Sequence, residues 1–237
     1  PMISAATATP AMYTMGGSDI GFFGWPSVVD NANVMGPMSV AVPGTIAGLA
    51  LALETYGTIS LAEAIAPAID FAEAGFPVTW HTTLKIAQDL ALLTQDPVTR
   101  AVFTNNGVPW RTLDESAPTM LRQPDLAATL RTIADQGPRA FYEGELAARI
   151  ADGLSAAGNL ITTADLSGYT AVIEDALTVP YGDAIVHTPG NGTGGTTLAE
   201  SLLLLNGIDL RSMEYGGADY LHHLSEAFKI AFADRFA

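Results

Sequence analysis

The sequence contains no cysteine, and this absence excludes disulfide bonds, thiolate metal ligands and a thiol nucleophile. Positive charge is also scarce, because ten Lys and Arg stand against 25 Asp and Glu and give a net charge of −15. Binding to a phosphate backbone or an anionic membrane depends on clustered basic side chains, and here every Lys and Arg stands singly along the chain. We therefore expect neither nucleic acid nor a membrane as a partner.

Long apolar runs are missing as well. No run approaches the roughly 18 residues that a membrane-spanning helix needs, and residues 1–19 show neither the basic start nor the apolar stretch of a signal peptide. The compartment stays open between periplasmic or secreted and cytoplasmic. With 237 residues, 49% of them hydrophobic and 15% charged, the chain can bury a sizeable core, and we expect a single domain over 1–237.

Three regions differ in pattern within this expected domain. Residues 1–42 are rich in small and polar residues, and the stretch 14–36 predicts a long irregular loop. Residues 43–158 are mainly helical in pattern. Residues 159–237 combine two strand-like runs around the turn at 181–183 with two helices.

The predicted helices of the middle region carry recognisable start and stop signals. Pro43 suits a first-turn position and Gly57 a helix end. Ser60 followed by Glu63 predicts a capping box, and Pro67 is expected to kink or shorten the helix that it begins. Two further helices end at glycines, over 123–137 and 144–158.

A glycine-rich loop between a strand-like run and an apolar helix is the first candidate site. Gly190, Gly192 and Gly195 fit the dinucleotide pattern G-x-G-x-x-G. Gly190, Gly195 and Thr196 also fit a phosphate-binding P-loop, except that its lysine is missing. A dinucleotide site also needs an acidic residue at the end of a second parallel strand, and residues 208–216 contain no β-branched run for one. A nucleotide-binding module is therefore kept as an alternative only.

Other chemistries have weaker signals. His222 and His223 are adjacent, so on a helix they point about 100° apart, and no third metal ligand is evident; we expect no metal or other cofactor. No G-x-S-x-G nucleophile elbow occurs. Threonine pairs stand at 82–83, 162–163 and 196–197. None of these pairs begins the chain, where a threonine could use its own amine as base, and Thr162–Thr163 fits a helix N-cap.

Several segments together resemble a known family. The stretches 39–78 ("SVAVPGTIAGLALALETYG…GFPV") and 124–171 ("PDLAATLRTIADQG…SGYTA") are similar to the large subunit of the gamma-glutamyltranspeptidase family. The stretches 194–210 ("GGTTLAESLLLLNGIDL") and 222–235 ("HHLSEAFKIAFADR") continue the resemblance in the same order. It covers residues 36–237 with several motifs at family-like spacing.

The resemblance implies an α+β fold of the N-terminal-nucleophile hydrolase type, an αββα sandwich to which this chain supplies the mainly helical large-subunit portion. Members of the family cleave themselves, and the threonine that begins the small subunit attacks a γ-glutamyl amide to form an acyl-enzyme. Relatives on this scaffold hydrolyse other amides, such as cephalosporin side chains. The nucleophile would lie beyond Ala237, so we expect a small-subunit partner, a small γ-glutamyl or related amide as substrate, and no activity from this chain alone.

The resemblance also assigns a role to the glycine-rich loop. Where the family has Pro-Ser-Ser-Gly-Gly, residues 189–195 read "PGNGTGG", which keeps Gly194 and Gly195 but departs from the family at 191–193. By the resemblance, Thr193, Gly194 and Gly195 contribute to substrate binding, and the arginine that holds the substrate carboxylate falls just upstream of Pro1. Two readings remain beside this one: glycines that only let the strand-to-helix turn pack closely, and a non-catalytic homologue that keeps the fold.

Overall fold

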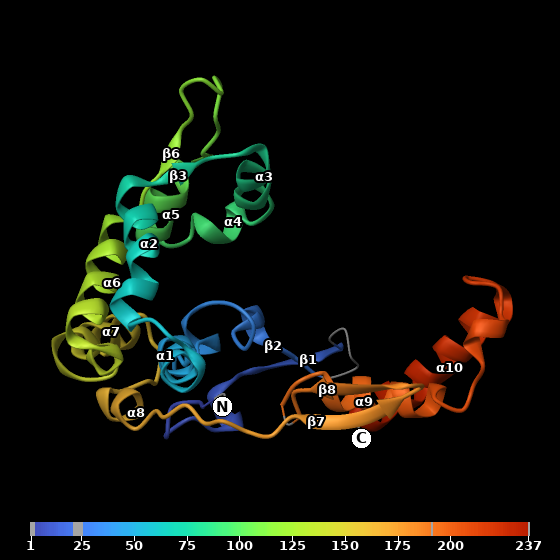
Figure 1. Ribbon diagram of the computed structural model, residues 1–237. Helices are drawn as coiled ribbons and strands as arrows, with labels where there is room; N and C mark the ends of the chain where they lie inside the picture. The colour runs from blue at the N-terminus through green and yellow to red at the C-terminus, as the bar shows by residue number, and fades with distance from the viewer. Residues whose placement is uncertain (1–2, 21–25, 191, 237) are drawn as a thin grey trace. The chain divides into compact units, whose positions relative to one another are not determined.

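The computed structural model describes residues 3–20, 26–190 and 192–236. The chain divides into two compact units, Pro1–Val172 and Ile173–Ala237, which are traced by colour in Figure 1 and described one at a time below. Both contain helices and short antiparallel strands, so the chain is α+β and mainly helical. The expected single domain stays a prediction.

The first unit begins with a hairpin where an irregular loop was expected. Strand β1 (Met15–Ile20) pairs antiparallel with β2 (Pro26–Val28), so the prediction of a loop throughout 14–36 is wrong. Two glycines in β1 conceal the alternating pattern that marks a strand, and the pairing comes from backbone hydrogen bonds. The 3₁₀ turns of this region are Pro10–Met12, Val29–Asn31 and Pro37–Ser39.

Helices α1 (Thr45–Tyr56) and α2 (Leu61–Ala74) test the expected signals directly. The capping box is confirmed, since the Ser60 hydroxyl accepts from the Glu63 amide and the Glu63 carboxylate accepts from the Ser60 amide. Helix α2 runs through Pro67, which therefore does not shorten it. The N-cap of α1 is Gly44, so Pro43 precedes the helix instead of lying in its first turn.

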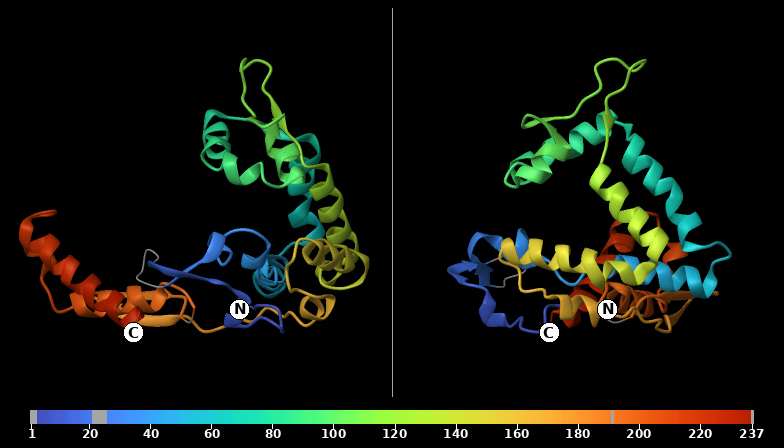
Figure 2. Two further views of the ribbon diagram at one scale, coloured as in Figure 1. Left: turned by 180° about the vertical axis from the view of Figure 1, so that it is seen from behind. Right: turned by 90° about the vertical axis from the view of Figure 1, so that its left-hand side faces the viewer.

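The remaining described elements of this unit are short strands, six further helices and one 3₁₀ turn. The helices are α3 (Trp80–Gln88), α4 (Leu90–Leu93), α5 (Pro97–Phe103), α6 (Pro124–Gln136), α7 (Gly144–Ala156) and α8 (Thr163–Ser167), and the turn is Pro138–Phe141. The strands form two antiparallel pairs, β3 (Phe76–Pro77) with β6 (Met120–Leu121) and β4 (Thr104–Asn105) with β5 (Val108–Pro109). Helices α2 and α6 lie side by side in both views of Figure 2.

Two apolar clusters hold this unit together. The larger one gathers residues from the N-terminal segment, α7, α8 and the segments beside them: Ala5, Val42, Tyr142, Ala147, Ala151, Ile161, Leu166 and Tyr169. The smaller one contains Val78, Ile86 and Leu121. Because the larger cluster joins residues more than 160 positions apart, it fixes the N-terminal segment against the end of the unit.

The second unit is a two-stranded hairpin covered by helices. Strands β7 (Leu177–Tyr181) and β8 (Ala184–Thr188) pair antiparallel around a turn at Gly182, as the sequence predicts. Helix α9 (Gly195–Leu205) packs on them, and α10 (Ala218–Arg235) packs on α9, with a 3₁₀ turn at Leu210–Ser212 between. The buried residues of α9 are small except for Leu205, which allows close packing around the helix: Gly195, Thr197, Ala199, Ser201 and Leu205.

Candidate functional site at the glycine loop

The glycine loop lies between β8 and α9, and its last glycine is locked in place. Gly195 is the buried first residue of α9. A Cβ atom at this position would lie 1.6 Å from the Pro189 carbonyl oxygen and 2.6 Å from Oγ1 of Thr188. No side chain fits in that space, so position 195 requires glycine.

Thr193 closes the loop with its side chain. Its Oγ1 lies 3.1 Å from the Pro189 carbonyl oxygen and 3.2 Å from that of Gly190, and it accepts a hydrogen bond from the Gly195 amide at 3.1 Å. The single hydroxyl proton serves one of the two carbonyls at a time. Gly192 has φ +72°, a left-handed conformation that favours glycine. Asn191 lies outside the described residues.

Backbone amides at the start of α9 are available for an oxygen ligand. The first intrahelical donor is the Leu198 amide, which donates to the Gly194 carbonyl at 2.9 Å. The amides of Thr196 and Thr197 precede it and point along the positive end of the helix dipole. Gly194 itself is exposed. Such a turn can stabilise a carboxylate or the oxygen of a polarised carbonyl.

Arg235 reaches this turn from the end of α10. Its Nη1 donates to Oγ1 of Thr197 at 3.2 Å, and a Cβ atom on Gly194 would lie 3.5 Å from the same nitrogen. The sequence gives no indication of this contact, because 38 residues separate Thr197 from Arg235 and no single motif contains both.

The dinucleotide pattern does not have its structural context here. A dinucleotide-binding loop connects a parallel strand to its crossover helix, whereas β8 pairs antiparallel with β7. All strand pairs in the described part of the chain are antiparallel. The loop resembles the nucleotide pattern in its glycine spacing alone.

The other sequence candidates have structural roles or stand apart. Thr162 caps α8, and its hydroxyl accepts from the Asp165 amide at 3.2 Å, as predicted. His222 is exposed and His223 half-buried, with ring centroids 5.7 Å apart. Within the described ranges, no group of three His, Asp or Glu side chains could hold a metal ion.

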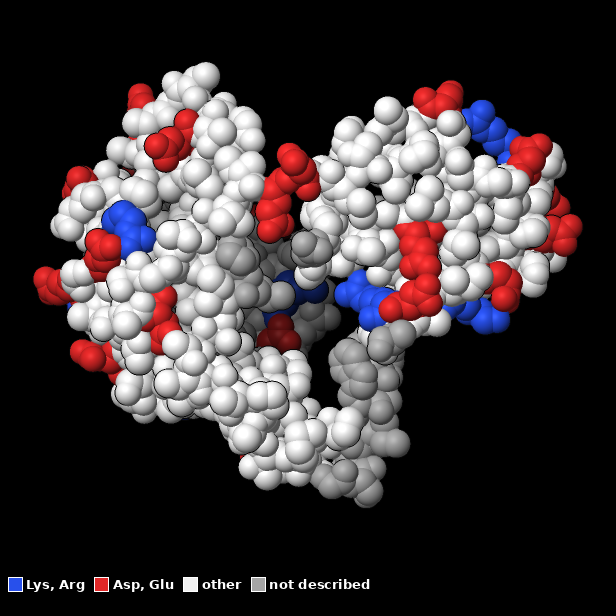
Figure 3. Space-filling view, turned by 90° about the horizontal axis from the view of Figure 1, so that it is seen from below, with Lys and Arg blue, Asp and Glu red and all other residues white. Residues whose placement is uncertain are grey.

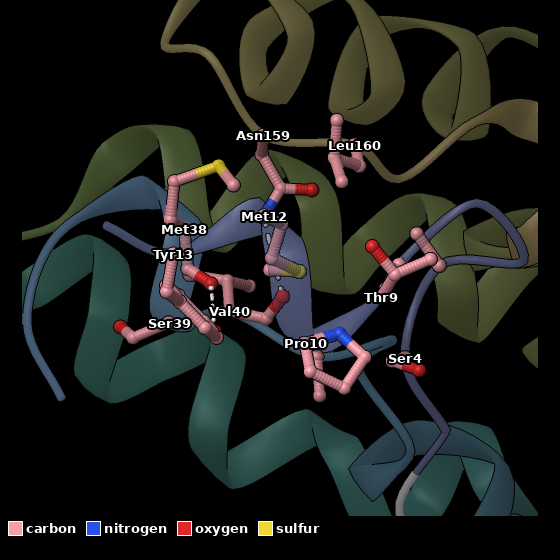
Figure 4. Close-up of a pocket in the computed structure, with 13 residues that line it drawn as sticks. Ser4, Thr9, Pro10, Met12, Tyr13, Met38, Ser39, Val40, Asn159 and Leu160 are labelled. Carbon is pink, nitrogen blue, oxygen red and sulfur yellow. Dashed lines mark hydrogen bonds between the residues drawn. The ribbon is translucent and has the colours of Figure 1, made fainter. Parts of the chain in front are cut away.

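An apolar pocket of about 320 Å³ lies in the first unit (Figure 4). It is lined by the N-terminal segment, residues 38–41 and residues 159–160. Met12, Met38 and Leu160 supply apolar surface, while the Tyr13 hydroxyl is occupied by a bond to the Met38 carbonyl at 3.0 Å. None of the 13 lining residues is acidic or basic, so the pocket suits a neutral apolar group. The sequence gives no signal for it, since its walls come from distant segments.

Surface charge follows the composition. On the face that Figure 3 shows, red Asp and Glu side chains are widely spread and blue Lys and Arg side chains are few. Among the described residues, no helix combines the length and the apolar character that crossing a membrane requires.

Comparison with known proteins identifies the family. The sequence profile named Gamma-glutamyltranspeptidase matches residues 4–237. The chain is 40% identical over 208 residues to the "Acylase ACY 1 proenzyme" of Pseudomonas sp. (strain V22), covering 87% of this chain and 36% of that protein. It is 34% identical over 204 residues to the "Glutathione hydrolase proenzyme" of Escherichia coli (strain K12), covering 84% of this chain and 34% of that protein.

A solved structure agrees with the sequence comparisons. The gamma-glutamyltranspeptidase of Helicobacter pylori superposes with a TM-score of 0.88 at 26% identity, over 100% of this chain and 64% of that one. In the sequence comparisons, the chain spans about a third of the length of the two curated relatives. From residue 4 to its last residue, this chain belongs to the gamma-glutamyltranspeptidase family.

Proposed function

We propose that this chain is the large-subunit portion of a self-processing amide hydrolase or acyltransferase with the αββα sandwich of N-terminal-nucleophile hydrolases. The family match over residues 4–237 carries the proposal. The word "proenzyme" in the names of both relatives supports self-processing. The described strands of this chain form only two-stranded sheets, so the sandwich requires strands from the rest of the protein, which would be the small subunit.

In the proposed reaction, the hydroxyl of the threonine that begins the small subunit attacks the carbonyl carbon of the amide. The hydroxyl proton passes to the threonine's own amine and then to the departing amine, which leaves an ester-linked acyl-enzyme. Water or an acceptor amine attacks this ester and regenerates the threonine. The role proposed for Thr193, Gly194 and Gly195 is to shape the acyl-group site beside that nucleophile, with the first turn of α9 facing the substrate oxygen.

The proposed substrates are γ-glutamyl amides and related amides. The 40% identity to a protein named as an acylase, against 34% to one named as a glutathione hydrolase, supports including amides beyond those of the γ-glutamyl group. The change at 191–193 supports the same view, because the loop beside the proposed site differs from the family sequence.

The test is to purify the full-length protein, determine its subunits by mass spectrometry and assay it on three amides. We expect two chains, the smaller beginning with threonine, and hydrolysis of a γ-glutamyl anilide, an oxamate or a cephalosporin. An intact single chain with full amidase activity would contradict the proposal. A protein that neither cleaves itself nor hydrolyses any amide would instead be the non-catalytic homologue.

A nucleotide titration by calorimetry addresses the alternative module. We expect no binding, because the loop lacks a lysine and a parallel strand. Micromolar binding that a Gly192→Val change abolishes would support that alternative.

A further inference from the structure

We propose that Arg235 is a positioning residue for the glycine loop. In this inference, which rests on the proposed function, the guanidinium at the end of α10 fixes the first turn of α9 and with it the amides that face the substrate oxygen. Arg235 does not itself touch the substrate. It acts through Thr197 and Gly194.

The contacts of Arg235 converge on that turn. Nη1 donates to Oγ1 of Thr197 at 3.2 Å and lies beside Gly194. Thr197 is 8% exposed, and its backbone carbonyl accepts from the Ser201 hydroxyl at 2.7 Å. Thr197 is therefore a fixed anchor for the guanidinium, which lies against the exposed Gly194.

The electrostatic setting distinguishes Arg235 from an ordinary surface cation. The N-terminal turn of α9 carries partial positive charge, which disfavours a cation. The same guanidinium sits at the C-terminal end of α10, whose partial negative charge favours it. Beside it, the carboxyl groups of Glu200 of α9 and Asp234 of α10 interact and raise the pKa of Glu200. Because two carboxylates repel when both are ionised, the hydrogen bond from Arg235 to Thr197 is an attractive polar contact between the end of α10 and the start of α9.

The other basic side chains of this unit behave differently. Arg211 pairs with Asp183 at 3.6 Å and Lys229 pairs with Glu226 at 2.8 Å. In the described part of residues 173–237, Arg235 differs from them in bonding to a neutral hydroxyl, in the first turn of α9. Because Arg235 is exposed, its hydrogen bond to Thr197 adds little to the free energy of unfolding. The property that we assign to it is the geometry of the loop and of the first turn of α9.

The experiment compares Arg235→Ala, Arg235→Lys and Thr197→Val in the full-length, processed protein, with Arg211→Ala as the matched control. We expect Arg235→Ala to lower kcat by about 10-fold on the amide that the wild type hydrolyses best, with KM within about twofold. Lys keeps the charge but not the planar fork, so Arg235→Lys recovers part of the loss. Thr197→Val acts in the same direction, while Arg211→Ala retains wild-type kcat.

Hydrogen exchange separates this inference from the proposed function. We expect the Gly195 and Leu198 amides, which donate to Oγ1 of Thr193 and to the Gly194 carbonyl, to exchange at least about 10-fold faster in Arg235→Ala than in the wild type, whether or not the protein hydrolyses amides. Unchanged exchange, or equal effects of Arg235→Ala and Arg211→Ala on kcat, would overturn the positioning role. A wild type that hydrolyses none of the amides overturns the proposed function. The exchange result still tests, in that case, whether Arg235 fixes the first turn of α9.

Discussion

Tyr142 and Tyr169 stack with ring centroids 5.6 Å apart and planes 11° apart. Both rings reach the start of α1. The Tyr142 hydroxyl donates to the Pro43 carbonyl at 2.7 Å and accepts from the Ala47 amide at 3.1 Å. A Cβ atom on Gly44 would lie 2.1 Å from the Tyr169 hydroxyl oxygen. Two aromatic residues from near the end of the first unit therefore cap a helix that begins about 100 positions earlier.

Replacing Tyr142 with Phe tests this cap. The change leaves the ring in the core but removes the hydroxyl, so the Pro43 carbonyl and the Ala47 amide lose a partner at a part-buried site. We expect the free energy of unfolding to fall by about 1–3 kcal/mol. Urea denaturation measures it. Tyr215→Phe is the control, because Tyr215 is 89% exposed and the change should stay within about 0.5 kcal/mol; equal losses in the two variants would contradict the cap.

Replacing Gly195 with Ala tests the locked end of the glycine loop. The new methyl group would overlap the Pro189 carbonyl oxygen, so the turn between β8 and α9 must move. We expect a loss of about 2–4 kcal/mol in stability and, if the proposed function holds, a large fall in kcat. Gly190→Ala is the matched control, since a Cβ atom there meets nothing within 4 Å. The idea fails if both variants unfold at the same urea concentration.

Asp165 predicts a loss of stability in acid. Hydrogen bonds from the Thr162 hydroxyl and, further, from the Ala6 and Thr162 amides lower its pKa below the ordinary 3.8. A carboxylate with a lowered pKa stabilises the fold above its unfolded pKa, and this contribution disappears as pH falls through the folded pKa. We expect Asp165→Asn to lower the free energy of unfolding by about 1–2 kcal/mol at pH 7. At pH 2 the difference from wild type should be much smaller. Urea midpoints at both values measure it, and a difference that does not change with pH would count against the assignment.

Glu200 predicts a pH dependence of the opposite sign. Its hydrogen bond with Asp234, together with burial and the Asp234 charge, raises the pKa of Glu200 above the ordinary 4.5. The folded state therefore binds the proton more tightly than the unfolded state, so this contact stabilises at low pH and weakens as pH rises through the folded pKa. We expect Glu200→Gln, which cannot ionise, to be more stable than wild type at pH 7 and equally stable near pH 4. Thermal unfolding at the two pH values checks this, with Asp209→Asn as an exposed control in the same unit; an equal shift at both would refute it.

Local sequence signals predicted the elements whose causes are local. The capping box at Ser60 and the N-cap at Thr162 form as expected, because they depend on residues three positions apart. The hairpin around Gly182 forms because alternating runs flank a two-residue turn. In contrast, β1–β2 is held by backbone pairing that the glycines of β1 conceal, and Pro67 is accommodated inside α2.

The candidate site divides in the same way. The position of the loop between a strand and a helix was predictable, and so was the presence of its glycines at a tight turn. The contact between Arg235 and Thr197 could not be predicted, and neither could the pocket that the N-terminal segment lines, because each brings together residues that are distant in sequence. The roles of Thr193 and Gly194 toward a substrate stay predictions.

The close approach of Gly195 to Pro189 has a consequence for altering selectivity. Chemical diversity cannot be introduced at the base of this loop, where even one methyl group has no room. The neighbouring position 190 opens onto free space, so a library meant to change the accepted acyl group should randomise Gly190 and hold Gly195 constant. Within one loop, position 195 must therefore stay glycine, whereas position 190 accepts other side chains.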